Sequence, residues 1–232
     1  MALRPYTALR QQRQTLLTAD LFADQLPEEA HLAIAPGAVL LRGFARAIDA
    51  ALIAAFEAVT AQSPLRHLVT PGGYTMSVAM SNCGPLGWVS DRSGYRYSAH
   101  DPLSGKAWPA MPAPWLDLAQ RAAAEAGYLG FVPDACLINS YQPGAKLSLH
   151  QDRDEKDLAA PIVSVSLGLP AVFQFGTSKR SDKPERFQLT HGDVVVWGGE
   201  SRLAFHGITP LADGVHALLG RRRINFTFRK TR

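Results

Sequence analysis

The strongest constraint on the fold is a series of short strand-like runs in the second half of the chain. From Asp134 onward, partly alternating apolar and polar residues are interrupted by Pro- and Gly-containing turns. The runs are ACLINSY, AKLSLHQD, PIVSVSLG, AVFQFG, RFQLT, DVVVWGG and RINFTFR. Short strands at such spacing are typical of an antiparallel sandwich or closed roll. We therefore predict an α+β fold with a double-stranded β-helix (jelly-roll) core.

Two helices are predicted to pack outside this core. Apolar residues recur at helical spacing in 46–62 and again in 113–126. The intervening segment 70–110 is rich in Gly, Pro, Ser and aromatic residues, which indicates loops and short hairpins of the kind that cover a binding site. The predicted organisation is a peripheral extension at 1–30 and a single domain at 31–232, with a lid at 66–110.

Composition narrows the classes of protein that the chain can represent. Of its 232 residues, 47% are hydrophobic and 19% charged, as expected for a folded domain. No apolar run approaches the roughly 20 residues of a membrane helix, so we expect a cytoplasmic protein without membrane attachment. Cys83 and Cys136 form no C-x-x-C pair, which excludes a thiolate zinc site and predicts two buried thiols. A net charge of +4 favours contact with a polyanion such as nucleic acid.

Three residues form a candidate metal site. In the run KLSLHQD, His150 and Asp152 are two positions apart, so on a strand their side chains share one face. A second imidazole, His206, lies in RLAFHGITP near the end of a strand run. Two histidines and one carboxylate are the ligand set of non-haem Fe(II) oxygenases, because they leave coordination positions open. A second H-x-D tripeptide, His191 and Asp193, is better interpreted as part of a hairpin turn.

The run RINFTFR predicts an anion receptor. Its residues Arg223, Asn225, Thr227 and Arg229 share one strand face, and apolar residues occupy the other. Guanidinium groups that face into a closed barrel are costly unless an anion neutralises them. Parity with Arg229 also admits Arg221 as an inward residue. In LINSY, Asn139 and Tyr141 share a face and could bind the same anion.

Each of these residues also has a structural interpretation. Taken singly, His150 is more often a hydrogen-bonded structural histidine than a metal ligand. Arg223 and Arg229 could lie on an exposed edge strand, and Asn139 could belong to a turn. The joint pattern favours a site, and a jelly-roll module that binds a metal or small acid without turnover remains the alternative from another class.

Five stretches of the chain resemble the AlkB family of iron(II)- and 2-oxoglutarate-dependent dealkylases. They are SPLRHLVTPGGYTMSVAMSNCGPLGW at 63–88, DACLINSYQPGAKLSLHQDRDE at 134–155, APIVSVSLGLPAVFQFG at 160–176, HGDVVVWGGESRL at 191–203, and RINFTFR. The resemblance implies that Fe(II) is bound by His150, Asp152 and His206. It implies that 2-oxoglutarate is bound by Asn139, Tyr141, Arg223, Asn225 and Arg229. It places Trp88, Tyr95, Arg96, Tyr97, Asp154 and Arg180 at the damaged nucleotide.

The resemblance also implies a reaction. With Fe(II), 2-oxoglutarate and O2, the protein is expected to remove alkyl groups from bases such as 1-methyladenine and 3-methylcytosine in DNA, preferably single-stranded, releasing formaldehyde. A base whose Watson–Crick edge reacts must be extruded or unpaired, and aromatic side chains such as Trp88 would stack on it. RNA, in particular transfer RNA, is the alternative substrate. A monomer is the expected state.

Overall fold

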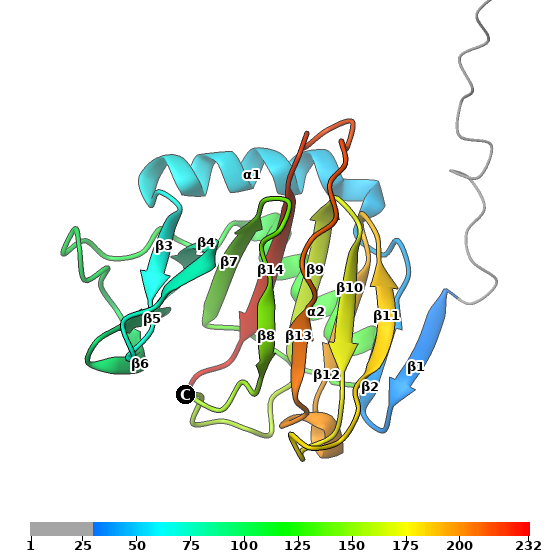
Figure 1. The fold of residues 1–232 in the computed structure, drawn as a ribbon. Coiled ribbons are helices and arrows are strands. Elements are labelled where there is room, and N and C mark those ends of the chain that lie inside the picture. Colours follow the sequence, from blue (N-terminus) through cyan, green and yellow to red (C-terminus); the bar gives the residue numbers. More distant parts are fainter. Residues whose placement is uncertain (1–29) are drawn as a thin grey trace, which may run out of the picture.

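The computed structural model describes residues 30–232, and its largest element is an eight-stranded antiparallel sheet (Figure 1). The predicted extension at 1–30 falls almost entirely outside the described residues. In spatial order the strands of the large sheet are β1 (His31–Ala35), β2 (Ala38–Leu41), β12 (Val194–Trp197), β9 (Ile162–Gly168), β14 (Arg223–Arg229), β7 (Ala135–Tyr141), β4 (Thr75–Cys83) and β3 (Arg66–Val69). The strand β14 is hydrogen-bonded on both sides, to β7 and to β9.

A smaller sheet packs against the large one. It has four strands in the order β11 (Glu185–Leu189), β10 (Ala171–Phe175), β13 (His206–Ile208) and β8 (Leu147–His150). A separate hairpin is formed by β5 (Gly87–Asp91) and β6 (Gly94–Ser98). Two facing antiparallel sheets confirm the predicted jelly-roll core, and each of the seven strand runs read from the sequence contains a strand.

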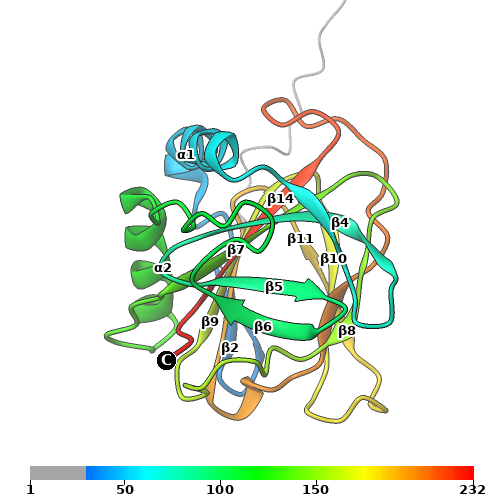
Figure 2. The same cartoon turned by 90° about the vertical axis from the view of Figure 1, so that its left-hand side faces the viewer.

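Both helices lie on the outer face of the large sheet, as Figure 2 shows. The helix α1 (Asp49–Gln62) follows a 3-10 turn at Arg46–Ile48, and α2 is Ala113–Glu125. A second 3-10 turn occupies Gly199–Ser201. Trp115 of α2 is fully buried and stacks on Phe226 of β14, with 3.9 Å between ring centroids. The two predicted helices are confirmed, and none of the helices in residues 30–232 is long and apolar enough to cross a membrane.

Strand alternation divides the interior into two layers. On β14, Ile224, Phe226 and Phe228 join the cluster between the helices and the large sheet. On the opposite face of the large sheet, Trp197 of β12 packs in a second cluster with Phe173 of β10, a strand of the small sheet, and this cluster forms the layer between the two sheets. Burying Phe226 contributes roughly 2 to 3 kcal/mol of transfer free energy. The same alternation turns the polar residues of β14 inward, where the apolar filling of the barrel is interrupted.

The prediction of loops and short hairpins for 70–110 is wrong for residues 75–83. These residues form β4, whose Cys83 lies opposite Cys136 of β7 in the large sheet. Both thiols are buried and unpaired, as expected. The physical reason is that β7 needs a hydrogen-bonding neighbour on each side. The expected short hairpin is present in this segment as β5 and β6.

Candidate active site

The three predicted metal ligands converge at one end of the small sheet. His150 of β8 lies directly opposite His206 of β13, and their ring centroids are 4.3 Å apart. Asp152 follows β8 by two residues, and its carboxylate oxygens lie 3.6 Å from His150 Nε2 and 3.8 Å from His206 Nε2. One ligand atom from each residue lies within 4.8 Å of the others. His206 begins β13, whereas the sequence suggested that it lies near the end of a strand.

Backbone carbonyls fix the tautomers of both histidines. His150 Nδ1 lies 2.9 Å from the carbonyl oxygen of Ser148, and His206 Nδ1 lies 3.0 Å from that of Ala204. A carbonyl only accepts hydrogen bonds, so in each ring Nδ1 carries the proton. Both Nε2 atoms therefore keep their lone pairs and point towards the carboxylate, which is the orientation of imidazoles that bind a metal.

The charges at the site are those that a divalent cation requires. Burial, aided by the neighbouring His150, lowers the pKa of His206 to about 4, so this ring is neutral at physiological pH. Burial opposes ionisation of Asp152, but Arg229 and the two histidines outweigh it and hold the pKa of this carboxyl below its usual range. Two imidazoles and one carboxylate on one side of the site fit Fe(II) with open positions.

Arg223 has the properties of a carboxylate receptor. Its side chain is 1% exposed, lies over the Tyr141 ring with 4.9 Å from Cζ to the ring centroid, and donates from Nη2 to Ser166 Oγ at 2.8 Å. Its Nε and Nη1 atoms are buried without a hydrogen-bond partner. Within residues 30–232 no carboxylate pairs with this guanidinium, and burial lowers its pKa. A bound dicarboxylate would supply the missing charge and acceptors.

The two predicted asparagines have different surroundings. Asn225 is satisfied, because its amide nitrogen donates to Ser164 Oγ at 2.8 Å and to the carbonyl oxygen of Val165 at 2.9 Å. Its oxygen accepts from Asn139 Nδ2 at 3.2 Å, whereas Asn139 Oδ1 is buried without a partner. Asn225 therefore orients Asn139, and Asn139 retains hydrogen-bonding capacity for a ligand. Tyr141, 1% exposed, lines the same region.

Arg229, which was predicted to bind 2-oxoglutarate, pairs with the carboxylate of the predicted metal ligand Asp152. Its Nη2 and Nε atoms donate to Asp152 Oδ2 at 2.7 and 2.9 Å, and its Nε also lies 3.4 Å from Glu155 Oε1. Although burial opposes it, these carboxylates raise the pKa of Arg229. The structure thus brings Arg229 to the metal ligand itself. Of the neighbouring arginines, Arg223 faces inward as the motif indicated, while Arg221 is exposed and pairs with Asp213 at 2.9 Å.

An aromatic pair lies on the β5–β6 hairpin, which is attached to the loop that follows Asp152. Trp88 and Tyr95 lie across the β5–β6 hairpin and stack with 5.4 Å between centroids and 15° between ring planes. Trp88 Nε1 donates to Asp154 Oδ2 at 2.8 Å, which attaches the hairpin to the loop that follows Asp152. Asn82 anchors the Trp88 backbone through two hydrogen bonds of 2.9 and 3.0 Å. Trp88, Tyr95 and Asp154 are therefore brought together as predicted.

The other predicted nucleotide contacts have partners within the protein. Arg96 forms an ion pair with Asp91 of its own hairpin at 2.7 Å. The Tyr97 hydroxyl donates to Glu155 at 2.5 Å, which directs this side chain to the interior. Arg180 donates to the carbonyl oxygen of Leu149 at 2.8 Å and keeps an exposed guanidinium near the end of β8. Among Arg96, Tyr97 and Arg180, only Arg180 is exposed and positively charged without a carboxylate partner in the part of the chain that the structure describes.

Several residues of the site were missed in the sequence. Ser164 and Ser166 of β9 accept hydrogen bonds from Asn225 and Arg223, and their alternation with valine in PIVSVSLG was a usable signal for an inward polar face. Glu155 and Arg202 form a buried ion pair at 3.1 Å. They stand among charged and glycine-rich neighbours, so no periodicity marked them as interior residues.

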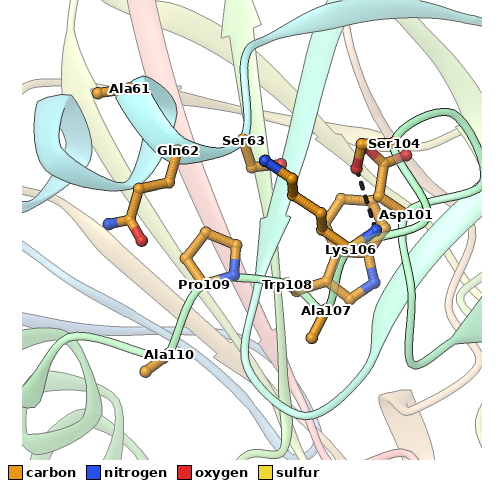
Figure 3. Close-up of a pocket in the computed structure, with 10 residues that line it drawn as sticks. All are labelled: Ala61, Gln62, Ser63, Asp101, Ser104, Lys106, Ala107, Trp108, Pro109 and Ala110. Atoms are coloured by element: carbon orange, nitrogen blue, oxygen red, sulfur yellow. Dashed lines mark hydrogen bonds between the residues drawn. The ribbon is translucent and has the colours of Figure 1, made fainter.

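A separate pocket lies away from these residues. It has a volume of about 500 Å³ and is lined by the end of α1 and the loop from 101 to 110. Figure 3 shows Gln62 and Lys106 on opposite sides of it. Asp101 on its wall pairs with Arg66, which lowers the pKa of Asp101 to about 2. None of the predicted site residues lines this pocket.

Comparison with known proteins assigns the family. Residues 37–229 match the model of the 2OG-Fe(II) oxygenase superfamily, so the chain belongs to this superfamily of Fe(II)- and 2-oxoglutarate-dependent dioxygenases. Within it the chain is an AlkB-family protein. It is 62% identical over 211 residues to the alpha-ketoglutarate-dependent dioxygenase AlkB of Escherichia coli K12, covering 91% of this chain and 97% of that one.

Two further comparisons agree with this assignment. The tRNA demethylase abh1 of Schizosaccharomyces pombe is 34% identical over 160 residues, covering 63% of this chain and 53% of that one. The solved structure of OsALKBH1 aligns with a TM-score of 0.77 and 27% identity, covering 86% of this chain and 99% of that one. The predicted family, fold and cofactors, namely Fe(II), 2-oxoglutarate and O2, are confirmed.

Proposed function

We propose that this chain repairs N-alkylated nucleobases in DNA by oxidative dealkylation, with 1-methyladenine and 3-methylcytosine as representative substrates and single-stranded DNA as the preferred form. One observation carries the proposal. Asp154 lies two residues beyond the metal ligand Asp152 and accepts a hydrogen bond from Trp88. An aromatic surface and a carboxylate therefore lie immediately beside the metal ligands, where a base would have to be held.

The chemistry of the substrate matches these two groups. 1-Methyladenine and 3-methylcytosine carry a positive charge, because in both the methyl group is added to a ring nitrogen that bears no hydrogen. Such a cation is attracted to the face of an indole ring by about 0.5 to 2 kcal/mol, and Asp154 offers it a carboxylate acceptor. Because the reacting edge is inaccessible in a duplex, the base must be unpaired or extruded, which favours single-stranded substrates.

The protein contributes positioning and electrostatics to the reaction. When bound, Fe(II) with 2-oxoglutarate and O2 supplies the oxidation of the N-alkyl carbon, which leaves as formaldehyde. His150, Asp152 and His206 would hold the metal, and Arg223 with Asn139 and Tyr141 would hold the carboxylate end of the co-substrate. Arg229 holds Asp152 in its ionised form, and Arg180 lies where it could meet a phosphate.

The alternative substrate is RNA, and one relative is named a tRNA demethylase. Stacking on Trp88 and phosphate contacts serve both polymers, so a 2′-hydroxyl contact is the feature that would separate them. Turnover of matched DNA and RNA oligonucleotides, each with one 3-methylcytosine, measures the preference. We further expect a monomer in the cytoplasm, which sedimentation analysis and cell fractionation would check.

The test of the proposed function follows the methyl group. Protein purified without oxygen is mixed with Fe(II), 2-oxoglutarate and a single-stranded oligonucleotide carrying 3-methylcytosine, and mass spectrometry detects loss of the methyl after air is admitted. Loss that requires both iron and 2-oxoglutarate, and that is absent in His150→Ala, is expected. Methyl loss in His150→Ala would contradict the metal site, whereas no loss in the wild type would contradict the substrate. The absence of any 2-oxoglutarate consumption would favour a binding module.

A further inference from the structure

Arg202 is a buried cation with no place in the ligand sets described above. It is 3% exposed, and its three guanidinium nitrogens each have a different acceptor. Nε donates to the carbonyl oxygen of Ala160 at 2.9 Å, Nη1 to that of Asp152 at 2.7 Å, and Nη2 to Glu155 Oε2 at 3.1 Å. One side chain thus contacts the start, the middle and the end of the loop between β8 and β9.

This loop carries the carboxylate ligand of the metal. Residues 151–161 have no helix or strand, so backbone pairing does not fix the position of Asp152. Besides the carbonyl groups that Arg202 contacts, the loop is anchored within residues 30–232 by the Lys156 amide, which donates to the carbonyl oxygen of Thr231 at 3.0 Å. Arg202 is therefore the side chain that fixes the backbone of Asp152 itself.

The position of Arg202 is itself determined by the chain that leads to His206. It directly follows the 3-10 turn Gly199–Ser201, and Ser201 Oγ donates to the carbonyl oxygen of Pro36 at 2.7 Å. Four residues later the chain reaches the metal ligand His206 at the start of β13. Arg202 consequently links the segment that leads to His206 with the loop that carries Asp152.

Glu155 balances the charges of this network. It is 6% exposed, accepts from Arg202 and from the hydroxyl of Tyr97, and lies near Arg229. Without Glu155 the region would hold two buried guanidinium groups against the single carboxylate of Asp152, which is unfavourable in a desolvated site. Its contact with Tyr97 also attaches the loop to β6 of the β5–β6 hairpin.

We propose that Arg202 is a positioning residue for the metal centre: by holding both ends of the 152–160 segment, it sets the distance between the Asp152 carboxylate and the two imidazoles, with Glu155 as its counter-ion. Arg202 does not touch the metal, so its removal weakens metal binding without removing a ligand. Partners of metal ligands typically contribute 10- to 100-fold to affinity. Lysine would keep the charge opposite Glu155 but lose the planar set of donors.

The experiment measures metal affinity rather than turnover. Mn(II) binding to the full chain is followed by electron paramagnetic resonance, without 2-oxoglutarate or DNA. Arg202→Met is expected to raise the Mn(II) dissociation constant about 10- to 100-fold, and Arg202→Lys to give a smaller increase. Glu155→Gln should weaken binding as well, because it removes the counter-ion that holds the Arg202 guanidinium in place.

The control is another ion pair of a largely buried arginine. Arg42 contacts Asp193 at 2.8 Å in the turn before β12, whereas Arg202 lies beyond the other end of that strand. Arg42→Met should lower the free energy of unfolding in urea but leave Mn(II) affinity unchanged. If folded Arg202→Met binds Mn(II) like the wild type, or if Arg42→Met weakens binding as much, the positioning role is refuted. The inference rests on the proposed metal ligands, so Asp152→Ala is included. Unchanged Mn(II) affinity in Asp152→Ala would refute that ligand set instead.

Discussion

Replacing Arg223 with methionine should change ligand-free stability and co-substrate affinity in opposite directions. Methionine has a similar length, so the substitution removes a buried charge that lacks a carboxylate partner without opening a large cavity. Replacing buried ionic groups with apolar residues of similar volume is often neutral or stabilising by about 1 to 4 kcal/mol. The lost hydrogen bond to Ser166 and the contact with the Tyr141 ring offset part of this gain. We expect the free energy of unfolding without ligand to remain at or above the wild-type value.

The effect on 2-oxoglutarate is expected to be large. Arg223 has two buried nitrogens, Nε and Nη1, free to donate to a carboxylate. Hydrogen bonds to charged groups contribute about 1.5 to 3 kcal/mol each. Loss of two such bonds corresponds to about 3 to 6 kcal/mol, or roughly 10²- to 10⁴-fold weaker binding.

The two quantities are measured on the same protein. Urea unfolding with and without 2-oxoglutarate gives the stability and the stabilisation by the ligand, and isothermal titration gives the affinity. Arg221→Met is the matched control, because Arg221 is exposed and pairs only with Asp213; both quantities should stay near the wild type. An Arg223→Met protein that binds 2-oxoglutarate within about threefold of the wild type, or that is much less stable without it, would refute this account of the receptor.

Three further outcomes are expected. Trp88→Ala should weaken binding of a methylated single-stranded oligonucleotide by about 1 to 3 kcal/mol in a fluorescence titration, while 2-oxoglutarate affinity stays constant; equal loss of both would contradict a stacking role. Gly207→Ala should separate β13 from β8 and abolish Mn(II) binding, because the added Cβ would lie 2.6 Å from the carbonyl oxygen of Leu147. The control is Gly176→Ala, whose Cβ would lie 3.4 Å from its nearest neighbouring atom. Intact Mn(II) binding in Gly207→Ala would refute the prediction. Asp101→Asn should cost about 1 to 2 kcal/mol of stability at pH 6. Because Arg66 lowers the folded-state pKa of Asp101 to about 2 from 3.8, the ion-pair contribution is present above pH 4 and lost towards pH 2, so the difference from wild type in urea unfolding should vanish there; a pH-independent difference would contradict it.

The inward face of β14 was predictable because a strand has a side-chain period of two. In RINFTFR the polar and apolar residues separate cleanly, and the structure places them on opposite faces. The metal triad was predictable for a similar reason, since His150 and Asp152 share a face and His206 completed a known ligand set.

Other features depend on contacts that local sequence does not encode. The contact between Arg229 and Asp152 was not predictable, because tertiary packing decides whether an arginine meets a protein carboxylate. Glu155 and Arg202 look like surface charges in sequence, because a buried ion pair has no periodic signature. The strand β4 was missed because glycines and prolines on both sides of it indicate turns, and the whole segment was therefore assigned to loops and short hairpins.

The central position of β14 has a consequence for how the molecule assembles. This strand follows all others of its sheet in the sequence, yet it lies between β9 and β7. Until it inserts, β1, β2, β12 and β9 form one group of strands and β7, β4 and β3 another, each with an unpaired edge. Its non-local pairing makes insertion a late and slow step. Arg223 arrives with this strand, and so does Asn225, which orients Asn139. The proposed co-substrate site is therefore incomplete in any species that has not completed the sheet, and 2-oxoglutarate should bind only the fully folded protein.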